Sequence, residues 1–428
     1  MQTIIDNAGS VPQRAPHSIQ RIPMSLLHRR QAVVVFLAFA FAYFFAAVLR
    51  AITATLSPVL TQEFHLDAAA LGLLAGGYFL GFAVIQLPLG TWLDRHGPGK
   101  VIVRFVALAV AGCGAFALAQ SFGALMVGRV LCGMGVSACL MAPLTGFRRW
   151  FTPAVQLRTN SWMLMTGSLG QVASTLPVQW LLPHFGWRPI FWGLAVLMAL
   201  SMAIIWWRVP DWSQGDPSRD RGSYGPVWRD RYFWQMVPLG FFLYGGMIAV
   251  QSLWAGPWLV RVAGLAPGPA ASGLFLMNIC MLATFWCWGL ANPWLQRRGL
   301  VTDRLIAWLL PLNFVVQVAM LAMGPEAHGG MLALFCVTTT VVSLAQPAVG
   351  MKFPSHLAGR ALSAYNLVIF VGVFVVQWGI GLLVDGFRSA GWDEVAAFRG
   401  AFGVFLATTV LSYAWFLWSR SHNRLHRP

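Results

Sequence analysis

The chain has 428 residues, of which 58% are hydrophobic and only 10% carry a charge, and its mean hydropathy is +0.66. A soluble globular protein carries about a quarter charged residues, so this composition excludes an ordinary soluble domain. Runs of roughly 20 apolar residues recur along the whole length, enough to span a hydrocarbon core of about 30 Å. The sequence therefore predicts an all-helical polytopic membrane protein. It lacks the alternating segments of roughly ten residues that a membrane β-barrel requires.

The net charge of +16 is placed in a way that argues against nucleic-acid binding and indicates an orientation. No basic stripe with interleaved aromatic residues occurs on a soluble segment. With the N-terminus in the cytoplasm, 23 of the 29 Lys and Arg residues lie in inner tails, loops and flanks. Only Arg188, Arg261, Arg388 and Arg399 lie in outer loops. The positive-inside rule therefore favours a multi-pass protein of a bacterial-type inner membrane with both termini in the cytoplasm.

The apolar runs form two sets of six. We expect spans near residues 32–59, 69–92, 100–119, 122–146, 158–183, 187–208, 232–259, 268–293, 301–323, 329–351, 360–386 and 397–419. A polar connector separates the two sets, and its composition is that of a solvated linker. The predicted organisation is a cytoplasmic tail (1–31), a six-helix bundle (32–208), a cytoplasmic central loop (209–231), a second six-helix bundle (232–419) and a cytoplasmic tail (420–428).

The two halves repeat weakly. Residues 69–73, 92–97, 158–161 and 188–191 match residues 270–274, 294–299, 360–363 and 399–402. Each match alone is weak, but four in the same order at offsets of about 201–211 residues indicate a duplicated six-helix unit. Such a duplication places a substrate site near the membrane midplane between the halves and predicts alternating access by rocking.

A short charged turn, from Gly90 to Lys100, joins the second and third spans. We expect Gly90 to let two helices approach closely, and Gly97 and Gly99 to adopt turn conformations that a Cβ resists. Asp94 can accept hydrogen bonds from a neighbouring arginine, or cap a helix N-terminus. Such a contact can latch the inner face in one conformational state. The simpler interpretation is a positive-inside turn with a local salt bridge.

This turn resembles the signature that the major facilitator superfamily carries between its second and third helices. The matching residues are Gly90, Asp94, Arg95, Gly97 and Lys100. Two shorter elements are also similar to that family: the stretch from Arg129 to Gly135, and the triplet Gly186-Trp187-Arg188. The resemblance implies a transporter of twelve helices in two pseudo-symmetric bundles, with the charged turn at its inner gate. In the repeat, Gln296 stands where Asp94 stands, so we expect a weaker latch there.

Two arginines lie well within predicted spans, Arg50 and Arg129. An isolated arginine there costs at least ~2.5–3.5 kcal/mol, so each needs a cavity, a hydrogen-bond partner or the interface. The run from Tyr43 to Arg50 is similar to the first helix of the organic-anion branches of the superfamily, in which an arginine binds a phosphate or carboxylate. The resemblance implies that Arg50 binds the anion, and a bidentate contact suits that role. The alternative is that Arg50 snorkels outward or bonds helix carbonyls.

Arg129 resembles the fourth-helix arginine that is linked to proton coupling in many members of the family. The spans carry no deep Asp, Glu or His, since Asp385 and His184 sit near outer ends. A transporter that cycles protons on its own side chains usually shows a mid-membrane carboxylate. This leaves uptake of a weak acid with its proton, or uncoupled transport. Arg129 as a structural hydrogen-bond hub remains an equal alternative.

Further polar and aromatic side chains on the presumed cavity helices are candidate substrate contacts. They are Tyr43, Gln171, Tyr244, Gln251, Trp254, Gln346 and Asn366. Each of them can equally be an interhelical hydrogen-bond or packing group. Where the phosphate-binding branch has a second arginine in helix 7, this chain offers Gln251 and Trp254, so a monocarboxylate fits better than a phosphate ester.

We therefore expect a secondary transporter that takes up a small organic anion such as a carboxylate, with a co-transported proton as an open question. Efflux of drugs or toxic hydrophobic compounds is the alternative, although the Gly-Pro signature of drug antiporters is missing from the fifth span. A non-transporting sensor on the same fold is a third hypothesis. No catalytic constellation or metal-ligand spacing occurs, so we expect no enzyme, no cofactor and no metal. The expected partners are the substrate and the lipid bilayer, and the expected functional unit is a monomer.

Overall fold

The computed structural model describes residues 27–210 and 223–425, and in these residues every regular element is a helix. Residues 1–26 of the predicted N-terminal tail, 211–222 of the predicted central loop and 426–428 of the predicted C-terminal tail lie outside this range, and α18 continues into that last tail as far as Leu425. The first half contains α1 (Arg29–Phe64), α2 (Ala68–His96), α3 (Pro98–Ala117), α4 (Phe122–Val136), α5 (Ala138–Trp150), α6 (Pro153–Ala173), α7 (Leu176–Phe185) and α8 (Trp187–Arg208). A short helix, α9 (Gly225–Trp228), leads into the second half.

The second half begins with one long, irregular helical segment. It alternates between α-helix and π-helix: α10 (Arg231–Pro238), η1 (Leu239–Tyr244), α11 (Gly245–Ala249), η2 (Val250–Trp254), α12 (Ala255–Pro257) and η3 (Trp258–Val262). The remaining elements are α13 (Pro267–Arg297), α14 (Thr302–Met323), η4 (Gly324–Glu326), α15 (Gly329–Thr339), η5 (Thr340–Leu344), α16 (Ala345–Lys352), α17 (Ser355–Ser389) and α18 (Glu394–Leu425).

Among the described residues, eleven helical segments are long and apolar enough to cross a membrane. The missing one of the twelve predicted spans is 158–183, which was expected to be continuous. It is broken into α6 and α7 at Ser174 and Thr175. Pro177 follows directly in the first turn of α7, where it cannot donate a backbone hydrogen bond to the preceding turn. At the break, the carbonyl of Ser174 accepts a hydrogen bond of 2.8 Å from Thr55 of α1.

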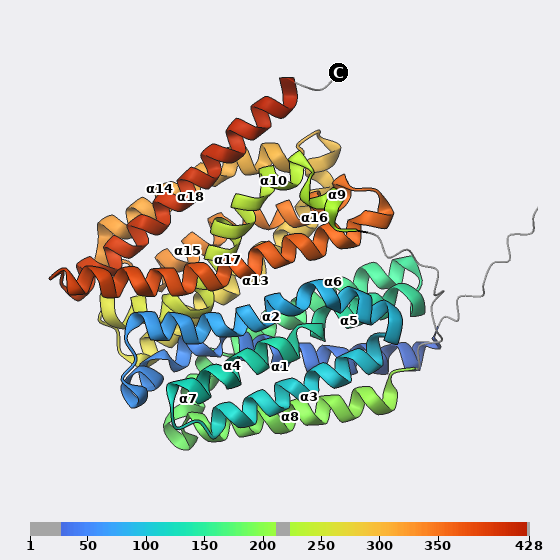
Figure 1. The fold of residues 1–428 in the computed structure, drawn as a ribbon, viewed down its shortest axis with the longest axis horizontal. Coiled ribbons are helices and arrows are strands. Elements are labelled where there is room, and N and C mark those ends of the chain that lie inside the picture. Colours follow the sequence, from blue (N-terminus) through green and yellow to red (C-terminus); the bar gives the residue numbers. More distant parts are fainter. Residues whose placement is uncertain (1–26, 211–222, 426–428) are drawn as a thin grey trace, which may run out of the picture.

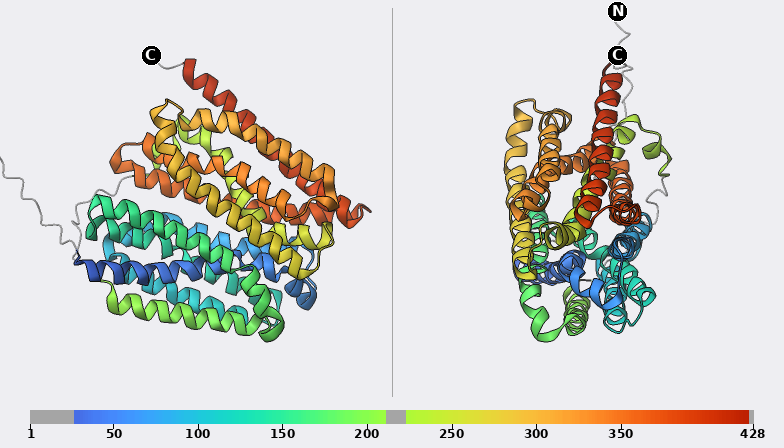
Figure 2. Two further views of the ribbon diagram at one scale, coloured as in Figure 1. Left: turned by 180° about the vertical axis from the view of Figure 1, so that it is seen from behind. Right: turned by 90° about the vertical axis from the view of Figure 1, so that its left-hand side faces the viewer.

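The two halves lie one above the other, with their long helices running in roughly the same direction (Figures 1 and 2). Their main contact is between α2 and α17, which run side by side. We call the end with the α1–α2 turn the turn-66 end and the opposite end, with the α2–α3 turn at Gly97, the turn-97 end. The predicted orientation puts the turn-66 end outside the cell.

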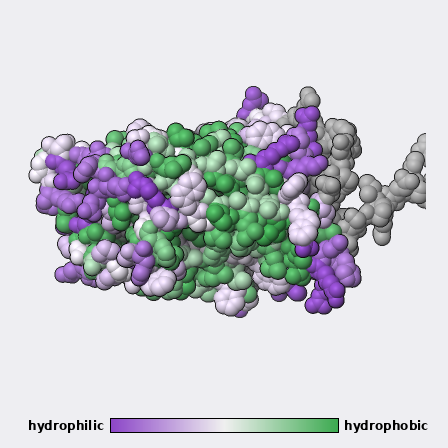
Figure 3. Space-filling model, turned by 90° about the horizontal axis from the view of Figure 1, so that it is seen from below, coloured by the Kyte–Doolittle hydropathy of each residue, from purple (hydrophilic) through white to green (hydrophobic). Residues whose placement is uncertain are grey.

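The surface is apolar around the middle of the molecule and polar at both ends. Figure 3 shows a broad hydrophobic band between two hydrophilic ends, with the long helices running across the band. Large apolar side chains are exposed on the outer helices, including Trp206 and Trp207 of α8, at 81% and 78%. A soluble protein would bury such residues, whereas a bilayer solvates them. The fold is thus that of a multi-pass membrane protein.

Candidate functional site

A charged and aromatic cluster lies where the two halves meet. Arg50 of α1 is half-buried, and its Nε is buried without a hydrogen-bond partner. Its guanidinium donates to the Tyr43 hydroxyl, and Tyr78 of α2 and Tyr244 of η1 lie near it. Tyr244 belongs to the second half, so the residues around Arg50 come from both halves. We call Tyr43, Arg50, Tyr78 and Tyr244 the Arg50 cluster.

No carboxylate approaches this cluster in the described residues. Its ring hydroxyls can stabilise the guanidinium by hydrogen bonding without neutralising its charge. A cation that is held in place and lacks a counter-ion is a site at which a bound anion gains the most electrostatic energy. The predictions for Arg50, Tyr43 and Tyr244 therefore meet in one place, and Tyr78 joins them.

Arg129 lies directly behind this cluster and is only 1% exposed. Its Nη1 donates to the carbonyl of Leu49 at 3.1 Å, one residue before Arg50. Its guanidinium carbon lies 5.0 Å from the ring centre of Tyr78 and 6.0 Å from that of Phe116. Arg129 thus packs between aromatic rings and holds the backbone of α1 at the point where Arg50 leaves it. Its Nε and Nη2 are buried without a hydrogen-bond partner among the described residues, so the structural role and the coupling role both stay hypotheses.

A chain of three amides crosses the junction next to the cluster. Gln251 of η2 donates to Gln171 of α6 at 3.2 Å and to Asn278 of α13 at 2.8 Å. Gln171 belongs to the first half and the other two belong to the second. Two of the predicted substrate contacts therefore bind each other, and Asn278 completes the bridge. We call these three residues the amide bridge.

The other candidate contacts lie elsewhere. Gln346 of α16 donates to Asn366 of α17 at 2.6 Å, so these two residues form a polar pair within the second half. Trp254 is fully buried, and its indole N–H donates to the carbonyl of Gln377 at 3.0 Å. A tryptophan whose only polar atom bonds the backbone of α17 is a packing group in this conformation.

The charged turn at residues 90–100 differs in part from expectation. Gly97 has a φ of +79°, as predicted for a turn glycine. Gly99 lies inside α3 instead, where a Cβ would come within 3.2 Å of Val209. A Cβ on Gly90 would meet nothing within 4 Å, so the expected close helix approach at Gly90 is wrong for this conformation. Arg95 and Lys100 are exposed, and the side chains of Asp94 and Gln296 lie outside the described residues.

At the opposite end the two halves are locked together. Asp385 near the end of α17 accepts hydrogen bonds from the first two amides of α2, those of Ala68 at 3.2 Å and Ala69 at 2.7 Å. Asp67 caps the next free amide, that of Ala70, at 2.6 Å. The first turn of a helix carries unpaired N–H groups and partial positive charge, so a carboxylate from the other half is a favourable cap.

Small residues let the backbones of the two halves touch at this same end. A Cβ on Gly72 would clash with the carbonyl of Gln377, and a Cβ on Gly381 would clash with the carbonyl of Ala68. Gly256 of α12 lies equally close to the carbonyl of Ala54 in α1. The contacts at these glycines and at Asp385 show the turn-66 end closed, whereas Gly90 at the turn-97 end faces open space.

The sequence profile of the Major Facilitator Superfamily matches residues 39–377, which is most of the chain. The protein belongs to this superfamily. Membership makes it a transporter of small molecules rather than an enzyme.

Named relatives carry the same family identity. The chain is 25% identical to the inner membrane transport protein YajR of Escherichia coli over 81% of this chain and 74% of that protein. It is 24% identical to the hexuronate transporter of E. coli, covering 74% and 82%. It is 28% identical to the gallate transporter of Pseudomonas putida, but over only 38% and 36%. These relatives include carriers of organic anions.

Among solved structures, a bacterial homologue of the human lysosomal transporter Spinster, in an inward-facing and unoccupied conformation, has a similar fold. The TM-score is 0.73 at 16% identity, and the match covers 92% of this chain and 98% of the other. The likeness confirms the predicted two-bundle fold and carries no information about the substrate.

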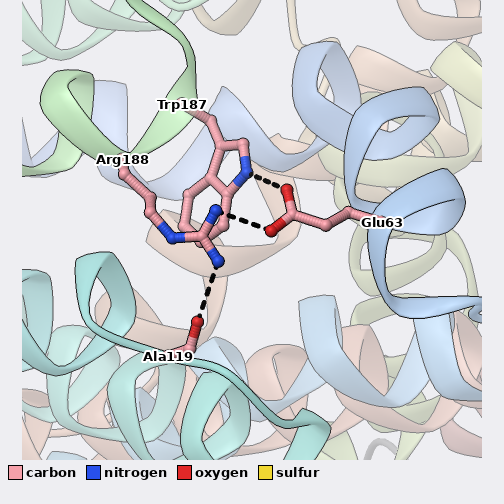
Figure 4. A network of polar contacts seen from close by, with 4 residues as sticks. All are labelled: Glu63, Ala119, Trp187 and Arg188. Carbon is pink, nitrogen blue, oxygen red and sulfur yellow. Dashed lines mark hydrogen bonds and ion pairs between the residues drawn. The ribbon is translucent and has the colours of Figure 1, made fainter.

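In this superfamily member, Trp187 and Arg188 of the Gly186-Trp187-Arg188 triplet form a network at the turn-66 end (Figure 4). Glu63, near the end of α1, accepts from the Trp187 indole at 2.7 Å and pairs with Arg188 at 2.6 Å. Arg188 also donates to the carbonyl of Ala119 at 3.1 Å. The network ties α1 to the α3–α4 turn and to α8. Trp187 is 3% exposed, so its ring packs inside the protein.

The second half repeats this ion pair with the charges exchanged. Arg261, near the end of η3, lies 3.6 Å from Glu394 at the start of α18. In the first half the acid is on the first span and the base on the last, while in the second half the base comes first. This correspondence was missed, because the aligned arginines were Arg188 and Arg399.

Sequence reasoning also missed Tyr78, Asn278 and Asp385 as parts of the junction. Tyr78 and Asn278 sit within apolar stretches, and a polar residue that interrupts such a stretch was the available signal. Asp385 was noticed only as an acid near an outer end, since its partner is a backbone terminus 317 residues away.

Proposed function

We propose that the transporter takes up a small organic carboxylate by alternating access, and that Arg50 binds its carboxylate group. The observation that carries this proposal is the Arg50 cluster. It provides a guanidinium with a free buried Nε, hydroxyls from both halves around it, and no acid among the described residues to neutralise it. An arginine presents parallel N–H donors that fit the two oxygens of a carboxylate.

The named relatives support the choice of carboxylate. Gallate and hexuronate, the compounds in the names of two of them, each carry one carboxylate and several hydroxyl groups. The Arg50 cluster suits such molecules, because tyrosine rings can pack against a sugar or aromatic ring while their hydroxyls bond its polar groups.

The mechanism follows from the position of the cluster at the junction. A carboxylate that bonds Arg50 of the first half and Tyr244 of the second links the two moving bodies. The amide bridge lies beside it and also has members on both halves. We infer that the contacts between the halves weaken when the halves rock, and that a bound substrate compensates by contacting both halves. The junction therefore prefers one conformational state when it is empty and another when substrate is bound.

The gating proposal assigns the two ends opposite roles. The Asp385 cap and the close glycine contacts hold the turn-66 end shut in this conformation. The charged turn with Gly90, Asp94, Arg95, Gly97 and Lys100 is proposed to act at the turn-97 end in the alternate state. With the predicted orientation, in which both termini lie in the cytoplasm of an inner membrane, we infer that the present state is inward-facing.

The proposal places no transported proton on the side chains of the protein. Among the described residues, no Asp, Glu or His lies near the Arg50 cluster. A carboxylate bound to Arg50 is unprotonated, so the proposed cycle carries the anion itself. Arg129 then acts as a positioning residue for α1, and a functional monomer suffices because both halves of the site lie in one chain.

The test is uptake by the purified protein in liposomes. Radiolabelled 4-hydroxybenzoate, gallate and glucuronate are offered at pH 6 and pH 7.5, beside the neutral analogue 4-hydroxybenzamide and a hydrophobic cation such as ethidium. The proposal expects uptake of at least one acid, competition by unlabelled acid, and no competition by the amide. Transport of the cation without any of the acids would overturn it in favour of drug efflux. Binding of an acid without flux would favour a sensor.

A further inference from the structure

A cavity opens at the turn-66 end, away from the Arg50 cluster. Its volume is about 220 Å³, and its walls come from both halves. The first half contributes Thr61 and Gln62 near the end of α1, and the second contributes Pro257, Val260 and Arg261. Thr61 lies eleven residues beyond Arg50 on the same helix, so at 1.5 Å per residue it is about 16 Å away along the axis. We call this cavity the vestibule.

The vestibule combines one cation with largely apolar walls. Its basic group is Arg261, whose guanidinium lies 3.6 Å from Glu394, a distance longer than a hydrogen bond. The hydroxyl oxygen of Thr61 is buried and has no hydrogen-bond partner among the described residues. Pro58, Leu71, Pro257 and Val260 supply the apolar surface. A cation and an unpartnered hydroxyl over an apolar wall suit a ligand with an anionic end and an apolar body.

The size of the vestibule sets the size of the ligand. An engineered apolar cavity of 150 Å³ binds benzene, so 220 Å³ has room for a single ring with a carboxylate. A carboxylate is favoured because Glu394 already places a carboxylate oxygen near the same guanidinium. A ligand carboxylate would exchange with Glu394, which is exposed enough (40% of its side chain) to turn toward solvent.

We propose that the vestibule is a second binding site, for a small monocarboxylate with an apolar body, and that an occupant keeps the turn-66 end closed. The effect on closure follows from the residues that line the vestibule. A ligand that contacts α1 and η3 together binds only while these two elements are close, and it therefore stabilises the closed state by its differential affinity. The proposal goes beyond the proposed function, because it holds whichever solute the Arg50 cluster carries.

Calorimetry on the purified full-length protein tests the binding step, with benzoate as the probe and benzamide as its neutral counterpart. The measurements use Arg50→Gln as the background, so that binding at the Arg50 cluster is removed. Benzoate is expected to bind with a stoichiometry near one, and benzamide is not. Adding Arg261→Gln should lower the affinity for benzoate at least tenfold. Glu394→Gln should raise that affinity two- to fivefold, because the competing carboxylate is removed. Arg388→Gln, an exposed outer arginine, is the control and should leave affinity unchanged.

Thr61→Val keeps the shape of the cavity and should weaken benzoate binding two- to fivefold. This variant tests the binding site even if Arg261→Gln fails to fold.

The closed-state claim is tested by spin labels on His65→Cys and Gly268→Cys, two exposed positions on different halves, with the exposed Cys287 replaced by serine. Benzoate should enrich the shorter distance in the parent and leave the Arg261→Gln variant unchanged. Absence of benzoate binding in the Arg50→Gln background, or binding that ignores both Arg261 and Glu394, overturns the vestibule. Neither result bears on carboxylate uptake through Arg50.

Discussion

Gln251 of the second half donates a hydrogen bond of 3.2 Å to Gln171 of the first, and the same amide group donates at 2.8 Å to Asn278. This is a polar contact between two bodies that must separate on one side during transport. Interhelical hydrogen bonds in membranes contribute about 0.6 kcal/mol on average. A bond of that size is weak enough to break in each cycle and strong enough to bias the state of the junction.

Replacing Gln171 or Gln251 by methionine should therefore alter uptake by a modest factor. We expect each single substitution to change the Michaelis constant two- to fivefold, because the amide that remains loses a partner. In free energy, the double substitution should cost less than the sum of the two single substitutions, with a coupling energy of about 0.6 kcal/mol in a double-mutant cycle. Strict additivity would contradict the direct contact. The pair Gln346→Met and Gln171→Met, whose members are not bonded to each other, supplies the additive control.

Removing the Asp385 carboxylate should loosen the turn-66 end. Asp385→Ala leaves the amides of Ala68 and Ala69 without their acceptors from the other half. Loss of a helix cap costs about 1 kcal/mol, which shifts a two-state equilibrium roughly fivefold. Labelling of a cysteine at Ala69 by a membrane-impermeant maleimide should speed up by a similar factor. Asp393→Ala removes a cap that bonds Ala396 within its own half and should leave labelling unchanged.

A methyl group at Gly381 should prevent closure of this end. A Cβ there would meet the carbonyl of Ala68 across the junction, so the halves must move apart. Overpacking of this kind costs about 1–3 kcal/mol. We expect Gly381→Ala to reduce uptake at least fivefold while the protein still inserts and purifies. Gly379→Ala lies on the same helix, where a Cβ would meet nothing within 4 Å, and near-normal uptake is expected. Equal loss in both variants would argue against the close approach.

The network at Glu63 should contribute to stability rather than to selectivity. Glu63 and Arg188 are 35% and 39% exposed, so solvent screens their attraction, and the pair contributes about 1 kcal/mol at most. Glu63→Gln should lower the melting temperature by about 2 °C, with uptake kinetics unchanged. Exchanging the charges as Glu63→Arg with Arg188→Glu should restore only part of the loss, because Trp187 keeps no acceptor. Full restoration would mean that the indole hydrogen bond contributes nothing.

Much of the architecture could be predicted from the sequence because bilayer physics acts on single segments. Length and apolarity locate the spans, and α8 begins and ends at the predicted residues 187 and 208. The break between α6 and α7 could not be placed the same way. Pro177 was visible, but many membrane helices continue through a proline. At the break, the carbonyl of Ser174 accepts a hydrogen bond from Thr55, a partner 119 residues away.

The candidate site was predictable only as a set of residue types. Arg50 could be singled out because an arginine within a membrane span is energetically costly unless it has a partner. Gln171 and Gln251 could be singled out because they are polar residues in apolar spans. That Gln171 and Gln251 bond each other, and that Gln346 instead bonds Asn366, depends on helix rotation, which composition does not encode. Trp254 carried the same sequence signal as Gln251, yet Trp254 bonds the backbone of α17 whereas Gln251 bonds side chains of α6 and α13.

The central claim is that the charge of Arg50 binds the substrate's carboxylate. Its most direct test is uptake of 4-hydroxybenzoate, or of whichever acid the wild-type protein transports, into proteoliposomes containing Arg50→Gln, Arg50→Lys or wild-type protein. The account predicts that Arg50→Gln loses at least 95% of uptake and of saturable acid binding. Arg50→Lys should retain a measurable fraction with a raised Michaelis constant, since a lysine keeps the charge without the paired donors. Wild-type affinity for the acid in folded Arg50→Gln protein would contradict it.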